Sequence, residues 1–175
     1  MLKALILCGG FGTRLQPLTK NTPKPLMTIG KKTVIEHIVD RLYLYGITEI
    51  IIKVHYLPDK IIEKLGDRVL YYYEPALFSH TETLIRLKKW LQDDEFMVIN
   101  GDTLSEIDYS DMIKNHKNGT ITHFMDSEYR GGGTWIYSSD WFDNKMIPID
   151  PYRPNKIFYD IGTIEKLDAA RKHFE

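Results

Sequence analysis

The chain has 175 residues, 43% of them hydrophobic and 27% charged, which is the balance of an ordinary globular protein with one packed core. Its formal net charge of −1 argues against a nucleic-acid partner, whose binding surface usually carries a basic excess. A single cysteine, Cys8, excludes an internal disulfide and a cysteine-based zinc site. No apolar stretch has membrane-spanning length and the apolar N-terminal run is short for a signal peptide, so we expect a cytoplasmic protein without a membrane partner.

Apolar patterning predicts strands and helices that alternate along the chain. Residues 2–7 are continuously apolar, which is typical of a strand buried on both faces. Residues 33–45 carry apolar side chains at helical spacing and end at Gly46. Ser79 and Glu82 have the spacing of a capping box, so a helix should begin there and run to about residue 91. The other predicted strands are 49–54, 68–73, 96–99, 120–125 and 134–138, and the other predicted helices are 59–65, 109–116 and 163–174.

Strands separated by helices of this length predict a mostly parallel sheet with helices on both faces. Residues 144–155 contain three prolines and show no clear periodicity, so we expect an ordered surface excursion there. The pattern shows no linker, and the whole of residues 1–175 is therefore expected to form a single domain.

The stretch CGGFGTRLQPLTKNTPKPL, residues 8–26, directly follows the first predicted strand. In parallel sheets ligands bind at the carboxyl ends of strands, so this stretch should border a binding site. Gly9, Gly10 and Gly12 permit positive φ and let a ligand approach backbone N–H groups. Arg14 and Lys24 add positive charge, and the prolines on either side of Lys24 hold it in an extended segment. Amides with two cations predict a polyphosphate site.

Two common phosphate-binding motifs are excluded. The dinucleotide fingerprint would need a third glycine where Leu15 stands. The P-loop would need Ser or Thr where Lys32 follows Gly30 and Lys31. A glycine-rich turn with solvated cations is the plainer alternative for this stretch, but it gives no reason for a lysine between two prolines.

Two aspartates follow predicted extended segments. Asp102 comes after an apolar strand and Gly101, and Asp160 ends an aromatic run just before a glycine and a helix. Carboxylates at strand ends suit a hard divalent cation whose other ligands are phosphate and water. The alternatives are a turn aspartate at position 102 and a helix-capping acid at position 160.

These motifs together resemble the signature of the sugar-1-phosphate nucleotidyltransferases, the NDP-sugar pyrophosphorylases that include heptose-1-phosphate and mannose-1-phosphate guanylyltransferases. The runs that carry the resemblance are GGFGTRLQPLT at 9–19, PKPL at 23–26, VINGD at 98–102 and FYDIGTIE at 158–165. The resemblance implies a three-layer α/β/α, Rossmann-like nucleotidyltransferase fold with a mostly parallel mixed sheet. It also implies that a sugar 1-phosphate attacks the α-phosphorus of an NTP and that pyrophosphate leaves.

The resemblance also implies roles for individual residues. The expected catalytic residues are Arg14, Lys24, Asp102 and Asp160, of which Asp102 and Asp160 would hold Mg²⁺ or Mn²⁺. Backbone groups of Leu7, Gly9 and Gly10 would read one edge of the base, and Tyr73, Glu74 or His80 the other. The full set of expected nucleotide-binding residues is Leu7, Gly9, Gly10, Gly12, Thr13, Arg14, Lys24, Glu74, His80 and Gly101. The expected sugar-phosphate-binding residues are Gly133, Thr134 and Trp135.

The chain departs from the family where the base and the sugar should bind. Side chains at 74–83 replace a small-residue stretch, there is no E-K-P segment, and the usual N-A-G becomes GGG at 131–133. We therefore expect a reduced sugar-binding lobe at about residues 103–160. The expected partners are an NTP and a sugar 1-phosphate, with a homodimer possible. Two alternatives stay open: transfer to a non-sugar acceptor such as phosphocholine or a cofactor precursor, and a catalytically inactive, nucleotide-sugar-binding regulatory relative.

Overall fold

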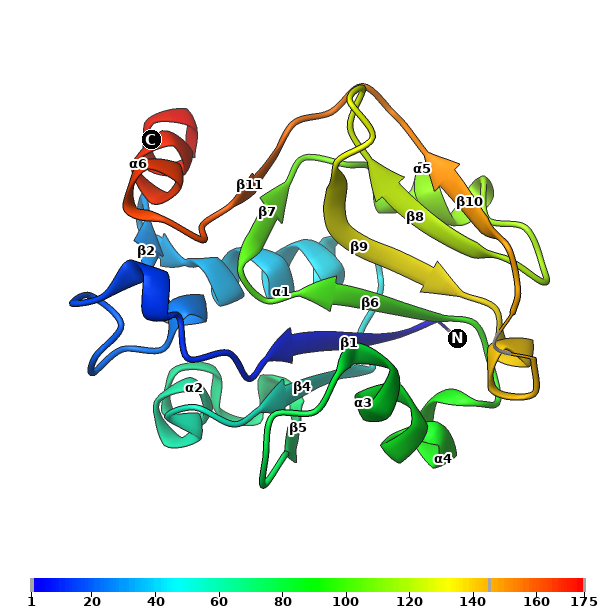
Figure 1. Ribbon diagram of the computed structural model, residues 1–175, viewed down its shortest axis with the longest axis horizontal. Coiled ribbons are helices and arrows are strands. Elements are labelled where there is room, and N and C mark those ends of the chain that lie inside the picture. The colour runs from blue at the N-terminus through cyan, green and yellow to red at the C-terminus, as the bar shows by residue number, and fades with distance from the viewer. Residues whose placement is uncertain (1, 145, 175) are drawn as a thin grey trace.

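A seven-stranded mixed sheet forms the centre of the computed structural model, which describes residues 2–144 and 146–174 (Figure 1). The strand order is β10-β8-β9-β6-β1-β4-β5. β6, β1, β4 and β5 are parallel to one another, β9 runs antiparallel to both β6 and β8, and β10 is parallel to β8. The bounds are β1 Lys3–Cys8, β4 Ile50–Val54, β5 Leu70–Tyr73, β6 Phe96–Asn100, β8 Ile121–Met125, β9 Gly131–Tyr137 and β10 Ile149–Tyr152.

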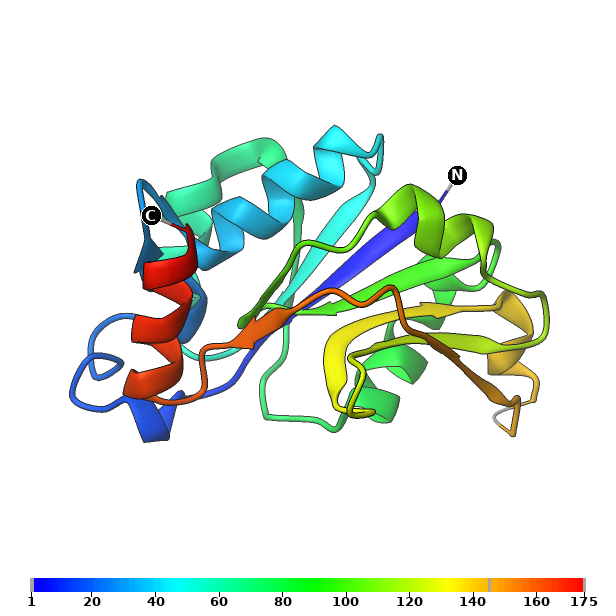
Figure 2. The same cartoon turned by 90° about the horizontal axis from the view of Figure 1, so that it is seen from above.

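Helices cover both faces of this sheet, as Figure 2 shows. One face carries α1 (Val34–Leu44), α2 (Pro58–Leu65) and α5 (Tyr109–Lys114), and α6 (Ile164–Phe174) joins the same core where it packs against β11 and β2. The other face carries α3 (His80–Arg86), α4 (Lys88–Leu91) and the 3-10 turn η4 (Ser139–Phe142). Ile6 packs into the first core and Leu5 into the second, and both are fully buried. This explains the continuous apolar run of β1 and confirms the three-layer α/β/α expectation.

Short elements join the sheet to the loops. They are η1 (Thr13–Leu15), η2 (Lys24–Leu26), β2 (Thr28–Ile29), β3 (Lys32–Thr33), η3 (Gly66–Arg68), β7 (Thr103–Ser105) and β11 (Phe158–Asp160). β2 pairs with β3, and β7 pairs antiparallel with β11 in a small sheet of their own. β7 and β11 lie far apart in the sequence, and their pairing places Thr103 opposite Asp160 and Ser105 opposite Phe158.

Two expectations from the sequence are wrong in detail. The sequence predicts a surface excursion without regular structure at 144–155, but this segment contains the edge strand β10, which pairs with β8 through one side of its backbone. Pro151 is tolerated there since an edge strand leaves alternate N–H groups unpaired. The helix predicted to run from Ser79 to about residue 91 is divided at Leu87 into α3 and α4, although the capping box of Ser79 and Glu82 is present as expected.

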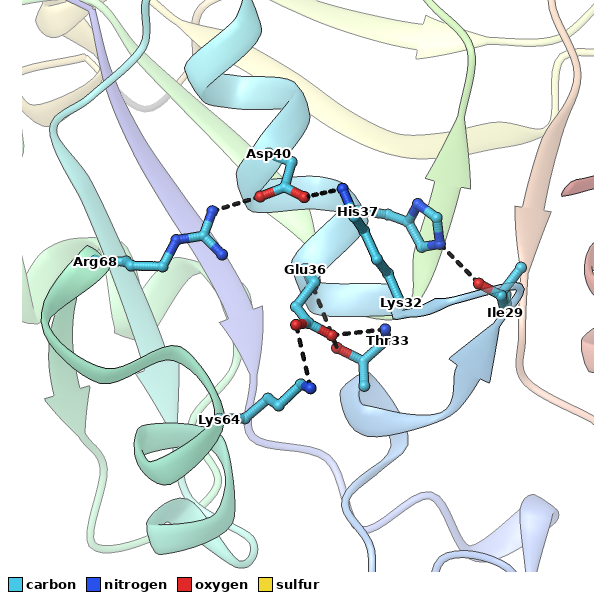
Figure 3. A network of polar contacts seen from close by, with 8 residues as sticks. All are labelled: Ile29, Lys32, Thr33, Glu36, His37, Asp40, Lys64 and Arg68. Carbon is cyan, nitrogen blue, oxygen red and sulfur yellow. Dashed lines mark hydrogen bonds and ion pairs between the residues drawn. The ribbon is translucent and has the colours of Figure 1, made fainter.

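The start of α1 is anchored by a polar network (Figure 3). Thr33 and Glu36 form a capping box, and Lys64 of α2 contacts Glu36 at 3.2 Å. Asp40, one turn further along α1, pairs with Arg68 of η3. These contacts fix α1 against α2 and hold the short hairpin that follows residues 8–26. The glycine-rich loop therefore connects β1 to a hairpin and a helix that these polar contacts hold in place.

Candidate active site

The glycine-rich loop folds back on itself around Gly12. This glycine has φ +64°, and its carbonyl accepts a hydrogen bond of 2.7 Å from the Thr19 hydroxyl. A Cβ at Gly12 would lie 3.3 Å from Cβ of Lys24, so the loop is closed tightly onto η2. Positive φ was expected at Gly9 and Gly10 as well, but these adopt ordinary backbone conformations. Gly10 is exposed with open space above it, which leaves its backbone accessible to a ligand.

Lys24 and Asp102 form an ion pair at the carboxyl end of β6. Lys24 Nζ contacts Asp102 Oδ2, and 14% and 25% of the two side chains are exposed. The other carboxylate oxygen of Asp102 accepts a hydrogen bond of 3.1 Å from the hydroxyl of Thr103. The sequence predicts an extended segment at Lys24, but this residue begins the 3-10 turn η2 and only Pro23 before it is extended. The ammonium group of Lys24 meets the aspartate that follows β6, and both side chains still reach solvent.

Asp160 lies beside Asp102 because β11 pairs with β7. The backbone N–H of Ile161 donates to the carbonyl of Asp102 over 3.0 Å. Asp160 Oδ2 contacts Lys166 of α6 at 3.0 Å. Asp160 Oδ1 and a guanidinium nitrogen of Arg14 both lie within 3.0 Å of the point that a Cβ on Gly162 would occupy. Arg14, Lys24, Asp102 and Asp160, all expected in the site, are therefore assembled at one edge of the sheet.

The two aspartates fit a hard divalent cation by their chemistry. Each is a partly exposed oxygen donor, and each has one carboxylate oxygen held by a lysine and one turned away from that lysine. Within the part of the chain that the structure describes, no group of three or more His, Cys, Asp or Glu side chains forms a protein-only metal site. A cation here would take its remaining ligands from phosphate and water, as Mg²⁺ commonly does.

Glu74 occupies a different position from the one expected of a base-reading residue. It is fully buried at the end of β5, where its carboxylate pairs with Lys53 Nζ at 2.8 Å. The hydroxyl of Thr83 donates to its other oxygen over 2.6 Å. Direct contact between Glu74 and a base is therefore wrong for this structure, because neither carboxylate oxygen reaches the surface.

His80 begins α3 and remains a candidate wall of the nucleotide site. Burial, and then the charge of Lys53, lower the pKa of His80 to about 4, so its ring is neutral at pH 7. Its Nε2 lies 3.4 Å from the hydroxyl of Tyr137, and its ring packs edge-on against Trp135 at 5.1 Å. Leu7 lies between β4 and β6, and its carbonyl accepts a hydrogen bond from Gly101 N over 3.0 Å, so that carbonyl is already engaged.

The expected sugar-phosphate residues are divided between the two faces of β9. Gly133 lies close to the side chains of Asn100 and Thr103, and therefore near Asp102. Thr134 is only 2% exposed, so its side chain is not available to a ligand. Trp135 stacks on His123 with ring centroids 4.8 Å apart, so a sugar could not lie on that face of the indole. Only Gly133 borders the aspartate site.

A cavity of about 260 Å³ has Asp160 in its lining. The β8–β9 hairpin, the segment before β11 and α6 form its walls, and Asp126, Arg130, Lys156 and Lys166 are among its charged lining residues. Arg130 is held by Asp126 at 2.7 Å. The lining of the cavity mixes these charged groups with apolar side chains such as Ile157 and Phe158 and includes Asp160, so the cavity could take the body of an acceptor that has both polar and apolar parts.

Residues 3–127 match the family model described as nucleotidyl transferase, which covers more than two thirds of the chain. The glycine-rich loop, Lys24 and Asp102 all lie within this match. The chain belongs to the nucleotidyl transferase family. The resemblance seen in the sequence is thereby confirmed.

Relatives of this nucleotidyl transferase chain agree with that placement. It is 36% identical over 126 residues to a mannose-1-phosphate guanylyltransferase 1 of Oryza sativa subsp. japonica, covering 66% of this chain and 35% of the relative. It is 32% identical over 151 residues to the catalytic subunit beta of mannose-1-phosphate guanylyltransferase of Dictyostelium discoideum, covering 79% and 42%. The chain therefore spans less than half the length of these relatives.

The fold of this nucleotidyl transferase is also found among solved structures. HddC from Yersinia pseudotuberculosis, complexed with GMP-PN, superimposes with a TM-score of 0.83, 21% identity and full coverage of both chains. At this identity the likeness concerns the fold, and it confirms the Rossmann-like architecture expected from the sequence. No helix in residues 2–144 and 146–174 combines the length and apolar character needed to cross a membrane.

Sequence reasoning missed Lys53, Lys166 and the charged lining of the cavity. Lys53 carried a usable signal, since it interrupts the apolar strand β4 and a lysine is almost never buried without a partner. Glu74 follows the next strand and is that partner. Lys166 and Arg130 carried no such signal, because a charged residue on a helix or in a hairpin is normally just solvated.

Gly101 sets how closely the aspartate strand approaches the glycine-rich strand. A Cβ there would lie 2.2 Å from Cys8 Sγ and 3.0 Å from the carbonyl oxygen of Leu7. Gly101→Ala should therefore lower the free energy of unfolding, measured by urea titration, by about 1–3 kcal/mol, the usual cost of overpacking.

Gly10→Ala is the matched control, because a Cβ at Gly10 meets nothing within 4 Å. It should leave the free energy of unfolding within about 0.5 kcal/mol of the unmodified protein. Equal stability of the two variants would mean that the approach of Gly101 to β1 is not the constraint described.

Proposed function

We propose that this chain transfers a nucleotidyl group from an NTP to a sugar 1-phosphate, giving an NDP-sugar and pyrophosphate. The observation that carries the proposal is the assembly of Arg14, Lys24, Asp102 and Asp160 at one edge of the sheet, beside the exposed backbone of Gly10. The named activity of the mannose-1-phosphate guanylyltransferase relatives supports it. Those relatives are much longer than this chain, so the activity of this chain is inferred from its own residues.

The glycine-rich loop and Arg14 would hold the triphosphate. Backbone N–H groups around Gly10 can approach phosphate oxygens closely, and the exposed guanidinium of Arg14 would neutralise the β- and γ-phosphates as they leave. Thr13, also exposed, lies between them in the chain and would border the same phosphates. The loop thus supplies binding, and Arg14 acts where negative charge accumulates.

Lys24 would move between two partners during the reaction. Without ligand, its ammonium group is paired with Asp102, which keeps a partly buried cation compensated. When phosphates enter, the same group can turn to the α-phosphate or to the attacking phosphate and offset the charge of two approaching anions. The attacking phosphate is already an anion, so the site needs no general base. Burial, and then the charge of Asp102, raise the pKa of the Cys8 thiol, which keeps it protonated and without a catalytic role.

Asp102 and Asp160 would hold Mg²⁺ or Mn²⁺. Such a cation, when bound, neutralises phosphate charge and aligns the attacking and leaving oxygens. The two aspartates contribute their fixed separation, set by the hydrogen bond from Ile161 to Asp102 and by the register of β11 on β7. Lys166 of α6 contacts Asp160 Oδ2 at 3.0 Å and would orient this carboxylate and offset its charge.

The acceptor would lie in residues 103–160, which we interpret as a reduced acceptor lobe of a single domain. Its strands β8, β9 and β10 extend the main sheet. A second candidate function, transfer to a non-sugar phosphorylated acceptor, is favoured by the stacking of His123 on Trp135, which covers one face of the indole that was expected to contact the sugar. The charged cavity beside Asp160 suits either acceptor. An inactive regulatory role is disfavoured, because all four charged residues are present and assembled.

A screen of pyrophosphate release tests this function. The purified chain would be incubated with each of the common NTPs and with sugar 1-phosphates, phosphocholine and a buffer blank, in the presence of Mg²⁺. We expect pyrophosphate release that depends on both an NTP and one phosphorylated acceptor. Release with no acceptor, or with none of the combinations, would contradict the proposal. The expected partners are these two small molecules, with a homodimer as a further expectation, and the expected location is the cytoplasm.

A further inference from the structure

A buried ion pair lies beside the start of the glycine-rich loop, on the other side of β1 from Asp102. Lys53 is next to the last residue of β4, and Glu74 directly follows β5. The ammonium and the carboxylate are 2.8 Å apart, and only 7% of the Lys53 side chain and none of the Glu74 side chain is exposed. Removing two charges from water costs free energy that their mutual attraction often does not offset, so stability alone does not explain this pair.

The pair lies where the nucleoside of an NTP would be placed. Arg14, Lys24 and the aspartates attract the phosphates to the α6 and β11 side, so the base extends in the other direction, across Gly9 and Gly10. Lys53 Nζ is 2.7 Å from the point that a Cβ on Gly9 would occupy, so it lies directly against that glycine. The absence of a side chain at Gly9 is what leaves room for the ammonium group.

The hydrogen-bonding capacity of the pair is unevenly used. The carboxylate of Glu74 accepts from Lys53, from the hydroxyl of Thr83 at 2.6 Å and, more weakly, from the N–H of Phe78 at 3.5 Å. The ammonium of Lys53 has three donors, and in the part of the chain that the structure describes Glu74 is its one ion-pair partner. Lys53 therefore keeps donors to spare, whereas Glu74 has no exposed oxygen to offer.

We propose that Lys53 is the residue that determines base specificity, by donating from its ammonium group to a carbonyl oxygen of the base. An ammonium group has donors and no acceptor, so it favours guanine, uracil or thymine and disfavours adenine and cytosine, which present an amino group at the corresponding position. Glu74 is the positioning residue, which holds the ammonium against Gly9. The inference rests on the proposed function only in requiring that an NTP binds beside the glycine-rich loop.

The test is nucleotide binding, which does not require an acceptor. Dissociation constants would be measured by isothermal titration calorimetry for GTP, ITP, ATP, UTP and CTP with the full chain and Mg²⁺. ITP against ATP, and UTP against CTP, compare a carbonyl with an amino group on rings of equal size. The unmodified protein should bind ITP more tightly than ATP if it prefers purines, or UTP more tightly than CTP if it prefers pyrimidines. Lys53→Met should reduce that preference by about 10- to 100-fold, which is the contribution of one charged hydrogen bond.

Two further variants keep the test decisive. Lys53→Met leaves the carboxylate of Glu74 buried without its ion-pair partner, which could prevent folding. A double variant, Lys53→Met with Glu74→Gln, removes both charges and keeps an amide oxygen that accepts the hydrogen bond from Thr83. This double variant should show the same loss of preference if the single variant does not fold. Lys64→Met, which removes an exposed lysine paired with Glu36 on α2, is the matched control and should keep the preference of the unmodified protein.

The outcomes separate this inference from the proposed function. A carbonyl preference that is absent from the unmodified protein, or that survives in both Lys53 variants, would overturn the inference even if transfer activity is found. Loss of the preference in these variants supports it even if no acceptor supports transfer, a result that would contradict the proposed function alone. A chain that binds none of the NTPs would contradict both.

Discussion

Asp102→Asn and Asp160→Asn should each abolish nucleotidyl transfer while leaving the protein folded. Each substitution removes one negative charge from the pair of carboxylates that β7 and β11 bring together, with almost no change in volume. The triphosphate and the attacking phosphate then meet without the cation that this pair would hold. The rate of pyrophosphate release with the preferred NTP and acceptor is the measurement, and circular dichroism with thermal unfolding verifies the fold.

Asp143→Asn is the matched control for both variants. Asp143 is 87% exposed, follows η4 and pairs with Lys88 of α4 at 3.7 Å, outside the site. Its conversion should leave the rate unchanged. Near-normal Mg²⁺-dependent activity in either the Asp102 or the Asp160 variant would show that the two-aspartate site is wrong.

Arg14→Ala and Lys24→Ala should lower kcat by about 10²-fold or more, with a smaller effect on nucleotide binding. Arg14 lies beside Asp160, and Lys24 is paired with Asp102, so both cations are next to the phosphates whose charge changes during transfer. The loop amides remain to bind the triphosphate in the ground state. Steady-state kinetics with each substrate varied in turn separate kcat from KM.

Lys117→Ala provides the comparison, because Lys117 is a 72%-exposed lysine paired with Asp150 outside the site. It should leave both kinetic constants unchanged. If Arg14→Ala and Lys24→Ala raised KM and left kcat intact, these residues would contribute only uniform binding, and their assignment to the transfer step would be wrong.

The sequence predicted the layers of the fold better than its edges. β1 and β6 were recognisable because both faces are buried, so their residues are continuously apolar. β10 was not recognisable, since an edge strand with proline and exposed side chains needs no such pattern. β7 and β11 are three residues each, too short for any periodicity, and their pairing depends on contacts between distant segments.

The residues of the site also differ in how well the sequence predicted them. Asp102 could be predicted because it follows β6, one of the parallel strands whose carboxyl ends share one edge of the sheet. Asp160 reaches the same edge through the antiparallel pairing of β11 with β7, which no local pattern indicates. Glu74 was found by the same reasoning but given the wrong partner, since position at a strand end does not say whether a side chain points to solvent or to a buried lysine. Thr134 was assigned to the sugar for a similar reason: alternation along β9 puts its side chain on a buried face and puts Trp135 on the opposite face, where one side of the indole stacks on His123.

The central claim is that the residues at this edge of the sheet transfer the α-phosphate of an NTP, with its nucleoside, to a phosphorylated acceptor. It is tested most directly by following radiolabel from the α- and γ-phosphates of the preferred NTP in separate reactions. We predict that the α-label appears in a nucleotide joined to the acceptor and the γ-label in pyrophosphate, and that both products require the acceptor. Release of the γ-label as inorganic phosphate, with the α-label left in a nucleoside diphosphate, would contradict the account.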